Sequence, residues 1–408
     1  MKKVKYIFSF FCFLLMTQGC TTVDKTDENS LQRIEFDLNK QHVNIHDVGL
    51  ISDIAIVNLA NEEVILGEIN KVIKKYDRIY ILDKNKTHSV FIYDNSGNLI
   101  NFISNVGNGP EEYIQLTDIF TNSMDATLNL VSRMDRKILK YDLEGANFKQ
   151  VEYLPKNFRQ FSKLEDGYVG YMGNYIEDGK HPKNIFTLSK DLQIKGEFLE
   201  IDETWDSKVL DNGSVFSNYE DKTYFIQPMD FNVYSIGTDM ISKTYYIDFG
   251  DKSWPQDLTE YGDVRRVLRE TPERYIQRFY DFQETDNFLI IKLLIKGQYC
   301  LALYNKSTQE TFVADLTPYT DKYFFPFGKI VGIDENAIYT SIEASEMKVF
   351  VTGKNEYNNF ESQYPEQIKR LREKFPNINE EGNPFLIIYY LKKMMLCWLF
   401  FCYFENNQ

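Results

Sequence analysis

A two-strand motif that returns at a fixed interval constrains this chain more than any other feature. In the first copy, Arg78 to Asp83 is followed by a polar turn and by Val90 to Asp94; in the second, Leu128 to Val131 is followed by a polar turn and by Ile138 to Asp142. Short runs rich in Ile, Val, Tyr and Phe between Asn, Asp and Gly predict β-strands joined in hairpins. A Tyr-Asp pair ends the second run of each copy, and the two pairs lie 48 residues apart.

Fainter copies of the motif continue along the chain. They occupy residues 185–188, 223–226 with 233–236, 288–291 with 301–304, and 337–340. Repeats of roughly 40–50 residues, each of a few short strands, are typical of β-propellers, whose blades are four-stranded sheets. The sequence therefore predicts an all-β fold, a six-bladed β-propeller over residues 34–392. Phe385 to Leu391 should close it by pairing with a strand near Ile54 to Leu59.

Two segments depart from this pattern and predict short inserted helices. In residues 258–282, apolar side chains such as Val264, Val267 and Phe279 recur at helical intervals among charges, and Pro272 interrupts the pattern, which predicts one or two short helices. The second helix, residues 364–375, has Pro365 in its first turn and ends before Pro376. We expect both helices to be solvated covers at one end of the propeller, with a dedicated partner-binding role as the alternative.

The first 20 residues indicate export. Three lysines precede an apolar run from Tyr6 to Met16, which is about half of the roughly 20 residues that a membrane-spanning helix needs. Residues 1–19 therefore predict a signal peptide, which resembles that of bacterial lipoproteins, with Cys20 as the lipidated residue. We favour this over an ordinary cleaved signal with an incidental cysteine. Residues 20–33 would then form the lipid anchor and tether.

This leader predicts a protein anchored by lipid to the outer membrane, facing either the periplasm or the cell surface. Asp24, Asp27 and Glu28 loosely resemble the acidic residues of surface-export signals. The formal net charge of −14 repels phosphate backbones, so nucleic acid is not an expected partner. The body has no disulfide framework, and Cys300, in an apolar stretch, is expected to be a buried side chain rather than a nucleophile.

The C-terminal extension, residues 393–408, contains an apolar run from Met394 to Phe404. This run is too short to span a bilayer. It could dip into a membrane surface or be a non-functional addition, and its lack of an amphipathic period favours the second alternative.

Strong catalytic and metal-binding signatures are absent from the sequence. There is no His-Glu-x-x-His, Gly-x-Ser-x-Gly or Cys-x-x-Cys. His42 and His46 are four residues apart, but the Val and Ile residues around them favour an extended chain over a helical metal site. We therefore assign no catalytic residue, metal or cofactor, although calcium bound by carboxylates and a glycoside-hydrolysing carboxylate pair both stay open.

Four phrases together resemble one family, the bacterial lipoproteins with six-bladed β-propellers, whose architecture is similar to that of NHL-repeat proteins. The phrases are residues 79–97, the loop from Gly107 to Tyr113, the segment from Tyr245 to Gly250, and the segment from Asn383 to Tyr389. The resemblance covers nearly all of residues 30–392 and implies the fold. The molecular activity of this family is largely undefined, so the resemblance implies no chemistry.

The most specific of these phrases contains Gly107, Gly109, Pro110, Glu112 and Tyr113. Its glycines permit positive φ and its proline restrains the next turn residue, which suits a crossover from the outer strand of one blade to the inner strand of the next. A phosphate cradle is the alternative, but two carboxylates follow the glycines and the expected Gly-Lys-Ser/Thr is missing. We interpret the loop as structural.

These observations favour a binding protein of the cell envelope. A rigid propeller could hold a partner protein, a peptide or a glycan at its axial face or its inserted helices. Aromatic residues on the loops could stack on such a ligand, and Tyr171, Tyr175 and Trp205 are the candidates. The alternatives are a hydrolase or lyase that uses carboxylates at the axial pocket, and a structural component of an outer-membrane complex.

Overall fold

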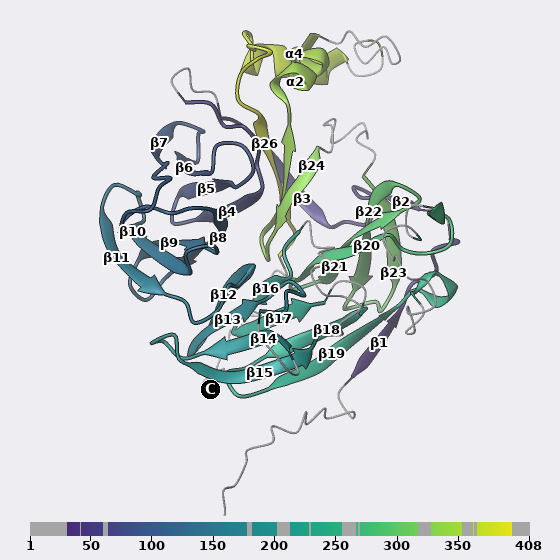
Figure 1. Cartoon of the computed structure of the whole chain (residues 1–408). Coiled ribbons are helices and arrows are strands. Elements are labelled where there is room, and N and C mark those ends of the chain that lie inside the picture. The colour runs from purple at the N-terminus through teal and green to yellow at the C-terminus, as the bar shows by residue number, and fades with distance from the viewer. Residues whose placement is uncertain are drawn as a thin grey trace, which may run out of the picture.

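The repeated two-strand motif forms the middle of six antiparallel sheets that surround a common centre (Figure 1). The computed structural model describes residues 31–40, 42–59, 64–177, 182–201, 213–227, 230–254, 267, 270–316, 328–352, 362 and 365–393. The predicted signal peptide, Cys20 and most of the C-terminal extension lie outside these residues. The six-bladed β-propeller predicted from the sequence is confirmed.

The blades follow one another along the chain, each starting with its inner strand. Blade 1 contains β4 (Lys71–Lys75), β5 (Arg78–Asp83), β6 (Ser89–Asp94) and β7 (Leu99–Ile103). Blade 2 contains β8 (Leu116–Asn122), β9 (Thr127–Ser132), β10 (Lys137–Asp142) and β11 (Phe148–Tyr153). Blade 3 contains β12 (Gln160–Leu164), β13 (Gly167–Tyr171), β14 (Lys183–Leu188) and β15 (Ile194–Glu200).

The second half of the ring has the same order. Blade 4 contains β16 (Phe216–Tyr219), β17 (Lys222–Ile226), β18 (Asn232–Ile236) and β19 (Ile241–Asp248). Blade 5 contains β20 (Arg278–Glu284), β21 (Phe288–Ile295), β22 (Gln298–Asn305) and β23 (Thr311–Asp315). Blade 6 contains β24 (Lys329–Ile333), β25 (Ala337–Ile342), β26 (Phe385–Leu391) and β3 (Ile51–Asn58).

The ring closes in blade 6, where strands from the two ends of the propeller pair. Strands β26 and β3 are antiparallel, with register from Phe385 opposite Asn58 to Leu391 opposite Ile51. The predicted closure is therefore confirmed. Each inner strand also contacts the inner strand of the next blade, including β24 with β4, so the ring has no free edge along its axis.

The N-terminal segment runs along the outer edges of blades 4 and 5 before it reaches blade 6. Strand β1 (Gln32–Glu35) adds to β19 in parallel, and β2 (Val43–Asn44) adds to β23 in parallel. Because β1 already belongs to blade 4, the folded part of the chain includes two residues that the sequence placed in the tether.

The hydrophobic core lies between the blades rather than inside any one of them. One cluster joins blades 1 and 2, another joins blades 2 and 3, and the others join blades 3 to 5, 5 and 6, and 6 and 1. Strands in the middle of a blade therefore bury both faces, which explains their near-continuous apolar sequences. A blade cannot bury these faces alone, and the ring is needed for stability.

An insertion between β25 and β26 carries two helices, which lie together beyond blade 6 (Figure 1). Helix α4 (Pro365–Lys374) confirms the prediction for 364–375 and buries Ile368 and Leu371. Helix α2 (Ala344–Thr352), which was not predicted from the sequence, buries Met347 and Val351 beside it. The ring of Phe375 packs edge-on against Phe385, with centroids 5.2 Å apart, and so connects the insertion to β26.

Of the one or two short helices predicted for residues 258–282, residues 258–266, 268 and 269 lie outside the described residues, and the last part of the prediction is wrong. Val267 and Glu270 are helical, and a short 3-10 helix, η3 (Gly250–Lys252), lies upstream. Residues 278–282 instead belong to β20, the inner strand of blade 5. Phe279, Tyr280 and Phe282 of this strand all pack in the core that joins blades 3 to 5. The register of β20 shifts between Tyr280 and Gln283, so its apolar residues do not simply alternate, and such a pattern can imitate helical spacing.

Candidate functional site

The two ends of the ring differ in their connections. We define the turn end by the connections between the first and second strands and between the third and fourth strands of each blade, and we call the opposite end the loop end. In blades 1 to 5, the connections at the turn end contain two to five residues. At the loop end, the longest connections are residues 201–215, 249–277, 316–328 and the helical insertion 343–384. Long connections on a rigid scaffold are where binding residues concentrate, so the loop end is the candidate functional face.

The carboxylates of the inner strands make bonds between blades. Asp118 of β8 accepts from Lys71 Nζ of blade 1 (2.6 Å) and from the backbone N–H of Phe161 in blade 3 (3.0 Å). Asp281 of β20 accepts from the N–H of Ser214 at the start of blade 4 (2.6 Å) and from Lys292 Nζ (3.2 Å). These two acids therefore act as structural links between blades.

Similar bonds cross the other junctions. Gln160 of β12 donates to the carbonyl of Gly213 and accepts from the N–H of Val215 in the next blade. Lys292 also donates to the carbonyl of Ile330 in blade 6, and Lys329 of β24 pairs with Glu68 at the start of blade 1 (2.8 Å). Within the described part of the chain, no group of three or more His, Cys, Asp or Glu side chains could hold a metal ion.

The histidines and Cys300 have separate surroundings. His42 Nδ1 lies 2.7 Å from Asp315 of blade 5, whereas His46 packs near Tyr389 of blade 6, so each contacts a different blade. Cys300 is buried in β22, and burial raises its thiol pKa to about 12, with the charge of Asp315 adding to the effect. A thiol with so high a pKa is a poor nucleophile.

The glycine-rich loop connects β7 to β8, the outer strand of blade 1 to the inner strand of blade 2. Tyr113 is buried, and its hydroxyl donates to the carbonyls of His88 (2.6 Å) and Ile103 (3.2 Å) in blade 1. Lys137 of β10 donates to the carbonyls of Gly109 and Glu112. These bonds attach the loop to both neighbouring blades around the turn at Pro110.

The glycines of this loop permit positive φ but do not adopt it. Neither Gly107 nor Gly109 has a positive φ. The Glu112 carboxylate folds back over both residues and accepts from the N–H of Gly109 (2.7 Å), and a Cβ at Gly107 would lie 2.1 Å from Glu112 Oε2. The glycines thus supply room for this carboxylate.

The three aromatic candidates have different positions. Tyr171 exposes only 1% of its surface and packs against Phe225 at 5.4 Å, so it is a core residue and not a ligand-binding one. Trp205 lies outside the described residues. Tyr175, on the β13–β14 connection at the loop end, exposes 38% of its surface.

Three connections of blades 2 and 3 meet around Tyr175 and Glu177. The Arg133 guanidinium lies over the Tyr175 ring, 5.2 Å from its centroid. Glu177 Oε1 accepts from Arg136 Nη2 (2.6 Å) and from Asn157 Nδ2 (2.9 Å), and Lys156 Nζ lies 3.4 Å from Glu177 Oε2. We call this set the Tyr175 surface; its members are Arg133, Arg136, Lys156, Asn157, Tyr175 and Glu177.

Of this set, only Tyr175 was predicted from the sequence. The other five come from segments up to about 45 residues apart, and none forms a motif with its neighbours. The pair Arg133 and Arg136 in one polar turn was the available signal, since a turn that separates two buried strands places such side chains on the surface.

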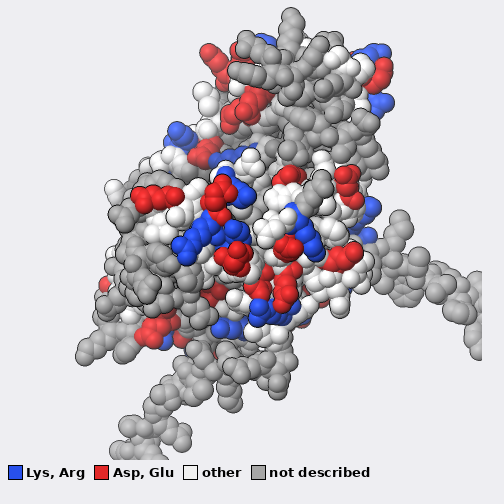
Figure 2. Space-filling view, turned by 90° about the vertical axis from the view of Figure 1, so that its right-hand side faces the viewer, with Lys and Arg blue, Asp and Glu red and all other residues white. Residues whose placement is uncertain are grey.

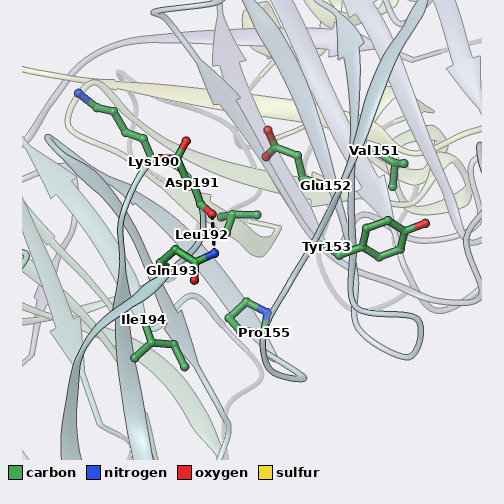
Figure 3. A pocket seen from close by; sticks show the side chains of 9 residues that line it. All are labelled: Val151, Glu152, Tyr153, Pro155, Lys190, Asp191, Leu192, Gln193 and Ile194. Atoms are coloured by element: carbon green, nitrogen blue, oxygen red, sulfur yellow. Dashed lines mark hydrogen bonds between the residues drawn. The ribbon is translucent and has the colours of Figure 1, made fainter.

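A shallow groove of about 770 Å³ lies elsewhere at the junction of blades 2 and 3 (Figure 3). Val151, Glu152 and Tyr153 of β11 form one side, and residues 190–194 of blade 3 form the other. Two of its three charged side chains have partners, because Glu152 pairs with Lys140 (2.8 Å) and Lys190 with Asp166 (3.0 Å). The third, Asp191, is exposed, and the groove is an outer gap between blades.

The side of the molecule that Figure 2 presents carries mixed charge. Lys and Arg side chains are interspersed there with Asp and Glu. A mixed surface of this kind is typical of a solvated face. In the described residues, no helix is long and apolar enough to cross a membrane.

Comparison with solved structures shows the same fold in another protein. The chain is similar to an inferred exported protein from Bacteroides fragilis, with 17% identity, a TM-score of 0.68, and coverage of 89% of this chain and 100% of that one. A member of the DUF4221 family from Bacteroides vulgatus is a more distant match, with 8% identity, a TM-score of 0.49, and coverage of 84% and 97%. No curated protein matches the chain.

The family comparison covers the whole propeller. The family described as "Domain of unknown function (DUF4934)" matches residues 31–390, from the residue before β1 almost to the end of β26. The matched segment includes both strands that close the ring. This chain therefore belongs to the DUF4934 family.

Proposed function

We propose that this protein is an exported, lipid-anchored binding protein of the cell envelope, whose propeller holds a protein, peptide or glycan at its loop end. One observation carries the proposal: an exposed Tyr175 ring is held by Arg133 among polar side chains of three connections. An aromatic face beside fixed hydrogen-bonding groups is a common ligand-binding arrangement. The bonds between blades keep the scaffold beneath it rigid.

The direction of β1 supports an arrangement in which the loop end faces away from the membrane. Strand β1 runs parallel to β19, which itself runs from the turn end to the loop end. The chain therefore enters the propeller from the side of the turn end. If Cys20 carries lipid, the residues between it and β1 can reach at most about 40 Å, which holds the turn end nearer to the membrane.

The binding role can be tested by photo-crosslinking in cells. A photoreactive residue in place of Tyr175 should give a defined adduct, to be identified by mass spectrometry. The same residue in place of Tyr76, which is similarly exposed at the turn end, is the matched control. Equal adducts from both positions, or none from position 175, would contradict the proposed function.

The anchor can be tested independently. Cys20→Ala should move the protein from the membrane fraction to the soluble envelope fraction, because a diacylated residue supplies the stable membrane attachment. Protease treatment of intact cells would then distinguish a surface from a periplasmic orientation. A membrane fraction unchanged by Cys20→Ala would exclude this lipid anchor.

A further inference from the structure

Two blades of this propeller have a fifth strand, and the other four have an open outer edge. Strands β1 and β2 add in parallel to β19 and β23, the outer strands of blades 4 and 5. Within the part of the chain that the structure describes, no strand pairs with the outer side of β3, β7, β11 or β15. An open edge presents unpaired backbone groups, to which an extended segment of another protein can add.

Strand β1 shows how a fifth strand is held. The N–H of Phe36, the residue after β1, donates to the carbonyl of Asp248 in blade 4 (2.8 Å). The side chains of Ile34 and Phe36 are both buried. The Phe36 ring stacks on Phe249 with centroids 5.5 Å apart, and Phe249 contacts Phe279 of blade 5 at 6.3 Å. The apolar face of this fifth strand is therefore directed toward the next blade.

Strand β2 repeats this arrangement in blade 5. Val43 and Ile45 are also two residues apart, and both pack in the core that joins blades 5 and 6. Residues two apart in a strand share one face, so each pair is directed to the next blade as a unit. A fifth strand of this ring thus has two apolar residues separated by one other residue.

The open edge of β11 in blade 2 has a groove on the side of its next blade (Figure 3). Glu152 extends from β11 toward residues 190–194 of blade 3, whereas Val151 and Tyr153 extend to the other side. All three residues nevertheless line the groove. Successive side chains of a strand alternate in direction, so a groove that borders three consecutive residues follows the edge of the strand.

The far wall of the groove offers apolar contacts. Leu192 and Ile194 of blade 3 line it, together with Pro155, which follows β11. Leu192 is buried in the core of blades 2 and 3, and Ile194 is 37% exposed. An apolar pair directed from a fifth strand toward blade 3 would contact this wall.

The backbone of β11 is also open. In β7 the N–H of Phe102 is bonded to the side chain of Asn101 (2.9 Å), and in β3 the N–H of Ile54 is bonded to the side chain of Asp53 (2.8 Å). Among the described residues, no side chain bonds a backbone N–H of β11. Strand β11 therefore combines a free backbone edge with a groove for side chains.

We infer that the outer edge of blade 2 binds an extended segment of a partner protein, which adds in parallel to β11 as a fifth strand. Two apolar residues of the segment, separated by one residue, contact Leu192 and Ile194. A second copy related by a two-fold axis would pair β11 with β11 in antiparallel, whereas both fifth strands of this ring are parallel. This edge is separate from the Tyr175 surface, and the inference does not depend on the ligand bound there.

A peptide with the sequence of residues 31–37, Leu-Gln-Arg-Ile-Glu-Phe-Asp, tests the inference because it carries the apolar pair of β1. Fluorescence anisotropy of the labelled peptide, titrated with the folded mature protein, should show saturable binding with a Kd below about 1 mM. Methylation of the backbone nitrogen at the position of Phe36 should weaken binding at least about tenfold, because it removes a donor to the ladder.

The same methylation at the position of Glu35 is the matched control for the peptide. Its N–H points away from the neighbouring strand, so the affinity should change less than about threefold. No saturable binding of the unmodified peptide up to about 1 mM, or an equal loss from the two methylations, would overturn the inference.

Variants of the protein assign the binding to blade 2. Ile194→Glu should weaken peptide binding about tenfold, because it places a charge in the apolar wall. Ile100→Glu is the matched control, since Ile100 is 38% exposed on β7, the outer strand of blade 1, and its loss should change the affinity less than about twofold. Circular dichroism should show that both variants are folded. Binding that Ile194→Glu leaves unchanged, or that both variants weaken equally, would overturn the inference.

Sedimentation velocity of the protein without peptide tests the other occupant of this edge. A monomer in both the parent protein and Ile194→Glu supports a partner protein. A dimer of the parent protein that Ile194→Glu converts to a monomer would show that a second copy occupies the edge, and would overturn the inference.

Discussion

At the scale of residues, the turn that follows each copy of the repeated two-strand motif has a defined geometry. Asp94 accepts from the N–H groups of Ser96 and Asn98, and Gly97 follows with a φ of 91°. The bond from the Asn98 side chain, with those from the backbone, lowers the pKa of Asp94. Asp142 and Gly145 form the same turn in blade 2, where Gly145 has a φ of 67°. The Asp-x-x-Gly pattern is therefore explained by an Asx turn that requires a left-handed residue.

Blade 3 contains the same turn without glycine. Leu192 occupies the corresponding position with a φ of 59°, and its N–H donates to the carbonyl of Ser189 as that of Gly145 does to Asp142. Its side chain is buried with residues of blades 2 and 3. Burial of a leucine is worth about 1.5–3 kcal/mol, which outweighs a left-handed backbone cost of about 1–2 kcal/mol.

We predict that Gly145→Ala destabilises the protein by about 2–3 kcal/mol in chemical denaturation. Part of the loss comes from the positive φ. The rest comes from a clash, since a Cβ at Gly145 would lie 2.4 Å from Ile92 Cδ1.

Gly297→Ala is the control for the backbone contribution. Gly297 has a φ of 76°, but a Cβ there would meet nothing within 4 Å, so only the backbone cost of about 1 kcal/mol is expected. Equal losses in the two variants would show that packing against blade 1 does not matter at Gly145.

At the scale of elements, the inner strands are connected by polar bonds as well as by apolar packing. The bonds of Asp118, Gln160, Asp281, Lys292 and Glu68 together cross all six blade junctions. Buried polar groups are costly when they lose their partners. These bonds therefore specify how each blade is placed relative to the next.

Asp118→Ala is predicted to cost about 2–4 kcal/mol of unfolding free energy, because it removes the acceptor of both Lys71 and the buried Phe161 N–H. Equilibrium denaturation in urea measures the loss. Asp166→Ala is the control, since its pair with Lys190 is exposed on both sides and should contribute less than about 1 kcal/mol. Similar losses from both variants would refute the structural role of Asp118.

The contribution of the junction of blades 6 and 1 to stability should decrease in acid. Partial burial alone would raise the pKa of Glu68, but hydrogen bonds from Lys329 and Asn85 and the charge of Lys329 outweigh it and lower the pKa to about 2. A depressed pKa stabilises the folded state above the ordinary value of 4.5, and this contribution is lost as the pH falls from about 4.5 to about 2.

Glu68→Gln should therefore lower the unfolding free energy at pH 7 by up to about 1 kcal/mol, since Lys329 is well exposed. The difference in unfolding free energy between Glu68→Gln and the parent protein should shrink below pH 4. Denaturation curves measured from pH 7 to pH 3 would reveal it. A difference that stays constant across this range would exclude the Glu68 carboxylate as its cause.

At the scale of the whole molecule, stability depends on closing the ring. Strand β26 pairs with β25 on one side and with β3 on the other, and it contributes to the cores on both sides of blade 6. Removing this strand would expose the faces of blades 5 and 1 together with the edge of β3.

We predict that a chain ending after residue 384, which lacks β26, fails to fold into a cooperative unit. A chain ending after Lys393, which lacks only the last 15 residues, should have a melting temperature within about 2 °C of the full chain. Thermal unfolding followed by circular dichroism compares the two. A cooperative transition in the shorter chain would refute closure as the source of stability.

The repeated hairpins, the closing strand and helix α4 could be predicted from the sequence, because each depends on local chemistry. The middle strands of each blade bury both faces and so appear as uninterrupted apolar runs, while Asx turns and Pro365 mark the boundaries. The inner strand β20 and helix α2 were missed because their patterns depend on which neighbours cover them.

The side chains that form a common surface could be identified only from the folded protein. It buried Tyr171 and exposed Tyr175, two residues of similar sequence surroundings, because blade 4 covers one and the loop end leaves the other open. It also brought Arg133, Asn157 and Glu177 from three separate connections to one place. Such proximity follows from the packing of neighbouring blades, which no local pattern in the chain encodes.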